Sequence, residues 1–246
     1  MSDITFEQND NLVLIAGETN TGKSGSLMAA KDDPGIMYLN CEAGKKLPFK
    51  AKFKQYTITD PMQVYEAFEA AEQMDDVHTI VIDTVTYLMD MYESQYVLTS
   101  DNTMKAWGNY AQYFINLMQQ YVAKSSKNVI ILAHTTQVYD ANEMVNQVVV
   151  PVKGSLSKKG IESFFSTVIS TKKVLLKDLK GYENDMLDIT EDDEMLGFKR
   201  VFQTRLTKET VNERIRGPIA MWDRNETYID NDISHVIKRL QEYYNE

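Results

Sequence analysis

The chain has 246 residues, of which 43% are apolar and 25% charged, and its formal net charge is −10. This size suffices for one α/β domain with a full core, and the acidic balance excludes general electrostatic adhesion to nucleic acid. Cys41 is the only cysteine, which excludes an intramolecular disulfide and favours a reducing compartment. No stretch approaches the roughly 18 apolar residues that a membrane helix needs, so we expect a cytoplasmic protein without membrane contact.

The first predicted elements are an apolar strand at 12–16 and, directly after it, a glycine-containing loop. The loop fits the pattern G-x-x-x-x-G-K-[ST], in which backbone N–H groups cradle a phosphate, the lysine reaches the β- and γ-phosphates and the hydroxyl binds Mg²⁺. A helix at 24–31 would aim its N-terminus at the same anion. We therefore expect ATP and Mg²⁺ as cofactors. The predicted nucleotide-binding residues are Gly17, Glu18, Thr19, Asn20, Thr21, Gly22, Lys23, Ser24 and Gly25, with Ser24 also on the metal.

An alternation of strands and helices follows along the chain. Strands are predicted at 36–40, 56–59, 79–83 and 128–133 by their apolar and β-branched content. Asp60-Pro61 is a typical helix start, with Asp as the N-cap and Pro at the first helical position, and a long helix is expected at 103–124. Beyond Val148 the predicted segments are β-rich, at 166–176, 198–207 and 219–222. Seven acidic residues between Gly181 and Gly197 indicate a solvated hairpin loop, and Asn231-Asp232 caps a final helix.

This order predicts an α/β fold: a mostly parallel central sheet with helices on both faces and a β-rich C-terminal extension of the sheet. We expect one domain over residues 1–246. Its parts would be a nucleotide-binding core at 10–150, a β-rich part at 151–230 and a terminal helix at 231–246.

Two carboxylates are candidates for the chemistry. Asp83 ends the strand 79–83, as a metal-binding aspartate does on a strand beside the phosphate loop; alone, such a residue is often a turn or cap. Many ATPases of this kind place a glutamate directly after that aspartate, but here the next residue is Thr84. Glu42, just past the strand 36–40, can reach the same sheet edge and act as the general base for water, or it is a solvated loop residue.

These features together resemble the RecA-type ATPase core, and more narrowly the phage RecA-like ATPases of the Sak single-strand annealing type. The resemblance rests on the phosphate loop, the run Asn40-Cys41-Glu42, the Asp83 strand, Trp107-Gly108, Ala133-His134-Thr135 and residues 150–154. It spans about residues 10–220. It implies that Lys23 and Ser24 bind phosphate and Mg²⁺, that Asp83 serves the metal and that Glu42 is the catalytic base.

The chain departs from RecA recombinases at the end of the fourth strand. Those proteins place Asn-Gln there, with the glutamine sensing the γ-phosphate, whereas this chain has His134-Thr135. His134 is our candidate for a catalytic sensor, and its alternative role is packing. Gln137 is a weaker candidate for the same task.

Basic residues form three clusters, each of which can also be an ordinary solvated face. Lysines at 45–54 follow Glu42. Lys153, Lys158 and Lys159, with the mobile Gly154 and Gly160, follow His134 where RecA-like proteins carry a DNA-binding loop. Near the C-terminal strands, Arg214 and Arg216 are candidates for catalytic arginines that reach a neighbouring subunit, because the sequence offers no arginine in or near the phosphate loop. This would require a homo-oligomer, as a ring or a filament.

The functional hypothesis is an ATP-hydrolysing RecA-like protein that acts on single-stranded DNA in phage recombination or annealing. The resemblance implies ATP, single-stranded DNA and a single-strand-binding protein as partners, in the host cytoplasm. Two alternatives stay open. One is another RecA-like motor or helicase loader, and the other is a small-molecule kinase, which the absence of an Arg-rich lid after the fourth strand disfavours.

Overall fold

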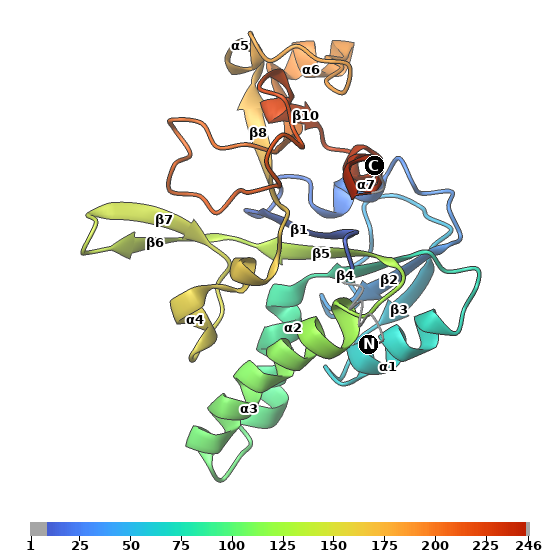
Figure 1. Cartoon of the computed structure of the whole chain (residues 1–246), viewed down its shortest axis with the longest axis vertical. Helices are drawn as coiled ribbons and strands as arrows, with labels where there is room; N and C mark the ends of the chain where they lie inside the picture. The colour runs from blue at the N-terminus through green and yellow to red at the C-terminus, as the bar shows by residue number, and fades with distance from the viewer. Residues whose placement is uncertain (1–8, 245–246) are drawn as a thin grey trace, which may run out of the picture.

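The computed structural model describes residues 9–244, so both ends of the predicted 1–246 domain lie outside it. A central sheet of eight strands runs through this part of the chain (Figure 1). Its strands are β1 (Leu12–Gly17), β2 (Ile36–Asn40), β3 (Lys54–Thr57), β4 (Thr79–Asp83), β5 (Asn128–His134), β8 (Val168–Leu175), β9 (Phe198–Gln203) and β10 (Tyr228–Asp230). Their spatial order is β10-β9-β8-β1-β5-β4-β2-β3; the pairs from β8 to β3 are parallel, and β9 is antiparallel to both of its neighbours, β8 and β10.

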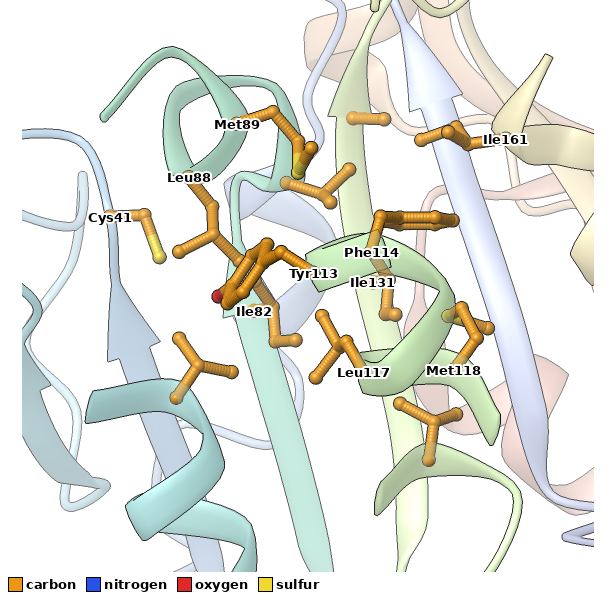
Figure 2. Packing of buried hydrophobic residues seen from close by; sticks show 14 of the residues in the cluster. Cys41, Ile82, Leu88, Met89, Tyr113, Phe114, Leu117, Met118, Ile131 and Ile161 are labelled. Atoms are coloured by element: carbon orange, nitrogen blue, oxygen red, sulfur yellow. The ribbon is translucent and has the colours of Figure 1, made fainter. Parts of the chain in front are cut away.

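Helices cover both faces of this sheet. The larger ones are α1 (Gln63–Glu72), α2 (Val85–Tyr92), α3 (Thr103–Asn116) and α7 (Ile233–Tyr244). Side chains alternate along β1: Leu14 and Ala16 pack with α1, α2 and α3, whereas Val13 and Ile15 pack with α7, as the two-residue period of a strand requires. Figure 2 shows the first of these layers, where side chains of α2 and α3 cover Ile82 of β4 and Ile131 of β5.

The remaining elements are short. Four-residue helices α4 (Leu156–Lys159) and α5 (Leu176–Leu179) and the six-residue α6 (Glu191–Leu196) lie in the C-terminal half. Turns of π-helix at Glu93–Val97 and Leu117–Val122 extend α2 and α3, and turns of 3₁₀ helix lie at Ser24–Leu27, Ile161–Phe164 and Asn225–Thr227.

The predicted α/β class is confirmed, with the mostly parallel sheet, the helices on both faces and the antiparallel extension through β9 and β10. Strands that were predicted from apolar runs agree within two residues, but the β-rich segment predicted at 198–207 ends early, at Gln203 of β9. The long helix at 103–124 is present as α3 and its π-helical extension. The acidic segment 181–197 links two antiparallel strands as expected, but it also contains α6.

Three local predictions are wrong. The helix at 24–31 reduces to the 3₁₀ turn Ser24–Leu27, because Ser-Gly-Ser is a poor helix former. The strand at 219–222 is absent among residues 9–244, and the chain instead forms β10 at Tyr228–Asp230. Asp83 was expected beside the phosphate-loop strand, but β5 lies between β1 and β4, since order along the chain does not fix order in a sheet.

A longer helix and a hairpin were also not predicted. Helix α2 begins with Val85-Thr86, which disfavour helix, yet five of its eight residues are buried, so packing overrides propensity. A two-stranded hairpin of β6 (Thr136–Asp140) and β7 (Val145–Val149) projects from the end of β5 (Figure 1). At its base the Val148 N–H donates to the Asn212 carbonyl. Among the described residues, no helix is long and apolar enough to cross a membrane.

Candidate functional site

A cavity of about 620 Å³ opens at the carboxyl end of the parallel strands, where ligands bind in open α/β sheets. Five predicted catalytic or metal-binding residues meet there: Lys23, Ser24, Glu42, Asp83 and His134. The full lining is Thr19, Asn20, Gly22, Lys23, Ser24, Gly25, Tyr38, Glu42, Lys45, Lys46, Pro48, Asp83, His134, Arg200 and Asn231. Gly17, Glu18 and Thr21 do not line this cavity but face a second one on the other side of the loop.

The phosphate loop, residues 17–24, is held in shape by its own lysine. Lys23 is buried, and its Nζ donates hydrogen bonds to the carbonyl oxygens of Gly17 at 2.9 Å and Glu18 at 2.8 Å. Gly22 has a φ of +110°, and a Cβ there would lie 2.5 Å from Asn231 Nδ2, so a glycine is required on both counts. Burial lowers the pKa of the Lys23 ammonium to about 8.

Asp83 joins the loop to the sheet. Its Oδ2 accepts hydrogen bonds from Ser24 Oγ at 2.7 Å and from Tyr38 Oη at 2.5 Å. Its Oδ1 is buried and has no hydrogen-bond partner within residues 9–244. Burial raises the pKa of this carboxyl above its usual range. An unpaired buried carboxylate oxygen next to a loop hydroxyl fits Mg²⁺, which proteins bind through one or two carboxylates together with substrate phosphates.

Glu42 accepts from two donors at the end of β2. Its Oε1 lies 3.0 Å from His134 Nε2, and its Oε2 lies 2.7 Å from Lys45 Nζ. The hydrogen bond with His134, and after it the bond and charge of Lys45, lower the pKa of Glu42 to about 2. The Glu42 side chain is only 9% exposed, which contradicts the alternative of a solvated loop residue. The His134 ring also packs edge-on against Tyr87.

The other predicted site residues lie outside the cavity. Gln137 lines the second cavity, of about 330 Å³. Arg214 forms an ion pair with buried Glu162 at 2.9 Å, and Arg216 is exposed while its backbone pairs with Val168. Lys153 is bound to Glu93, whereas Lys158 and Lys159 are exposed on α4.

The sequence did not predict six of the lining residues as part of this site: Tyr38, Lys45, Lys46, Pro48, Arg200 and Asn231. The signal for Tyr38 was a polar-tipped aromatic two residues before the end of a strand that is otherwise apolar. Arg200 lies on β9, and its Nη2 approaches Asn20 Oδ1 at 3.4 Å. The premise that no arginine of the same chain lies near the phosphate loop is therefore wrong. A residue 180 positions away gives no sequence signal of such proximity.

The family model described as an AAA domain matches residues 9–208. The chain belongs to this AAA-domain family of P-loop NTPases. The sheet and the phosphate loop are thus those of an α/β P-loop fold, and this AAA-domain protein is a nucleotide-binding ATPase. None of the curated proteins matches its sequence.

Nucleotide binding by the AAA-domain protein should take up protons in mildly alkaline solution. Free Lys23 loses its proton above a pKa of about 8, whereas bound phosphates stabilise the charged ammonium. ATP affinity should therefore be constant below about pH 8 and fall by up to about tenfold per pH unit above it. Calorimetry in buffers of different ionisation enthalpy measures the uptake. Lys23→Met is the control without the titrating group, and an affinity independent of pH would contradict the role of Lys23.

Tyr38→Phe should weaken nucleotide binding only when Mg²⁺ is present. The variant removes one of two donors that orient the Asp83 carboxylate, and removal of a hydrogen bond of this kind costs roughly 3- to 10-fold in affinity. Titrations of ATP with Mg²⁺ and with EDTA separate the two conditions. Tyr56→Phe, on the exposed face of edge strand β3, should change neither. An equal loss with and without Mg²⁺ would show that Tyr38 acts only through packing.

Proposed function

We propose that this protein is a Mg²⁺-dependent ATPase of RecA-like type that couples ATP hydrolysis to binding of single-stranded DNA, in recombination or annealing of the phage kind. The observation that carries the hydrolytic part is the meeting of Lys23, Ser24, Asp83, Glu42 and His134 in one cavity. A phosphate cradle, a metal-binding pair and a general base are the parts that phosphoryl transfer to water needs.

The chain's own residues divide the work in this proposal. Lys23 exchanges its two loop carbonyls for oxygens of the β- and γ-phosphates. Ser24 Oγ and Asp83 would hold the Mg²⁺, which would supply positive charge to the phosphates. Glu42 accepts the proton of the attacking water. A carboxylate with a pKa of about 2 is a weak base, so release of one donor would strengthen it. Lys45 is the donor free to turn away, because its side chain is 67% exposed.

Lysines beyond the hairpin support the DNA part of the proposal. The hairpin at 136–149 carries two acidic residues and no basic ones, so it offers no positive charge to bind DNA phosphates. The exposed Lys158 and Lys159 follow it on α4. Contacts of such lysines with phosphates would be independent of sequence and sensitive to salt. Lys153 contributes less to this surface, because Glu93 already pairs with it.

A homo-oligomer belongs to the same proposal. The exposed Arg216 is the better of the two candidates for an arginine that reaches a neighbouring active site, since Arg214 is held by Glu162. A single-strand-binding protein is a further proposed partner in the cytoplasm.

Glu42→Gln and Asp83→Asn should separate chemistry from metal binding. Glu42→Gln should keep affinity for ATP and Mg²⁺ and slow hydrolysis by about 10²-fold, as expected when a general base is removed. Asp83→Asn should in addition weaken Mg²⁺-dependent binding. Steady-state turnover and binding titrations test this. Lys23→Ala is the reference variant that should lose both hydrolysis and nucleotide binding. Equal defects in the two carboxylate variants would contradict separate roles.

The double variant Lys158→Ala/Lys159→Ala should bind single-stranded DNA more weakly whatever its sequence. The slope of log affinity against log salt should fall by about 0.7 for each DNA phosphate that a lysine no longer neutralises, while ATP turnover without DNA stays the same. Wild-type turnover should rise when single-stranded DNA is added. Lys153→Ala is the matched control and should have the smaller effect. An unchanged salt slope would move the DNA site to the lysines at 45–54.

A further inference from the structure

Arg200 and Asn231 line the cavity on the side away from the catalytic residues. The sheet order β9-β8-β1-β5-β4-β2 puts Arg200, on β9, to one side of the phosphate-loop strand β1. His134 ends β5, Asp83 ends β4 and Glu42 follows β2, so all three lie to the other side. The cavity therefore has a catalytic end and an opposite end. The proposed catalytic mechanism assigns no role to Arg200 and Asn231 at the opposite end.

The side chains of Arg200 and Asn231 contact the middle of the phosphate loop, at Asn20 and Gly22. Arg200 Nη2 lies 3.4 Å from Asn20 Oδ1, and the Arg200 Cδ would be 3.1 Å from a Cβ at Gly22. Asn231 Nδ2 donates to the Gly22 carbonyl at 2.8 Å. Asn231 Oδ1 is buried and lacks a hydrogen-bond partner within residues 9–244. Buried acceptors are nearly always satisfied in native proteins, so an acceptor left over at a cavity wall is consistent with a donor supplied by a ligand.

The catalytic end fixes the direction of a bound nucleotide. The γ-phosphate must lie near Glu42, because the base has to reach water in line with that phosphate. The β- and γ-phosphates then lie at Lys23, which binds them in this kind of loop. The α-phosphate, sugar and base consequently extend to the opposite end, over Gly22 and toward β9 and the start of α7.

We propose that Arg200 and Asn231 bind the α-phosphate and nucleoside of the nucleotide, and thus set its affinity without acting on the γ-phosphate. This inference rests on the proposed ATPase function. The guanidinium has donors for phosphate oxygens and a planar face for stacking on a base, and its weak 3.4 Å contact with Asn20 is readily exchanged. Asn231 anchors the loop by donating from Nδ2 to the Gly22 carbonyl, and its unpaired Oδ1 is an acceptor for a hydroxyl or amino group of the nucleoside.

The test compares ATP with ADP, which differ only in the γ-phosphate. Arg200→Gln should weaken binding of both by the same factor, about tenfold for the removal of one charged hydrogen bond. The turnover number at saturating ATP should stay within about twofold of wild type, because transition-state contacts remain. Asn231→Ala should also weaken binding of both nucleotides, but it releases the Gly22 carbonyl as well, so the turnover test rests on Arg200→Gln alone. Arg200 is exposed, so its replacement should not prevent folding, and circular dichroism checks this. Lys177→Ala, an exposed position on α5, is the charge-matched control.

Two results would overturn the inference. A loss of affinity for ATP but not ADP, or a large fall in turnover number, would place Arg200 on the γ-phosphate. Unchanged affinity for both nucleotides would remove it from the ligand altogether. The proposed ATPase function fails separately, if wild type binds ATP and ADP with normal Lys23 dependence but never hydrolyses ATP. Wild type that binds no nucleotide would overturn both proposals.

Discussion

The buried carboxylate of Asp83 is the interaction on which the site depends, because it joins three elements that are distant in sequence. It ends β4, accepts from Ser24 of the phosphate loop and accepts from Tyr38 of β2. Burial of a carboxylate is costly unless donors compensate, and here two hydroxyls do so on one oxygen only. The other oxygen is left without a partner among the described residues. This oxygen is left for a ligand in the proposed mechanism, and the chemistry of a carboxylate oxygen beside a hydroxyl matches Mg²⁺.

The phosphate loop is also held from the C-terminal side of the sheet. Thr21 Oγ1 lies 2.5 Å from Thr171 Oγ1 of β8, and the Asn231 amide holds the Gly22 carbonyl. The β-rich C-terminal part is thus more than an extension of the sheet, since it fixes the loop's shape. This explains why the loop keeps its conformation although only a 3₁₀ turn follows it: contacts with β8 and the start of α7 replace the support that a longer helix would give.

The success of the sequence predictions depended on whether the signal was local. The phosphate loop and most of the parallel strands were predicted because motif spacing and apolar runs are local. Glu42 and Asp83 lie in one cavity as expected, because parallel strands bring their carboxyl ends to one edge. The position of β5 between β1 and β4 was missed, and so was the approach of Arg200 to Asn20, because both are set by long-range packing. Helix α2 was missed for the same reason, since its burial and not its propensity forms it.

His134 connects the nucleotide site to the projecting hairpin. Its ring touches Glu42, the next residue, Thr135, donates from its backbone to the Gly17 carbonyl, and β6 begins one residue later at Thr136. A hydrogen bond between His134 and Glu42 therefore fixes the end of the strand from which the hairpin starts. Any movement of Glu42 that breaks this hydrogen bond as well would release the His134 ring and weaken the constraint on the hairpin's first strand. In the proposed mechanism Glu42 is the base, and this one side-chain contact would then couple hydrolysis to the surface beyond the hairpin.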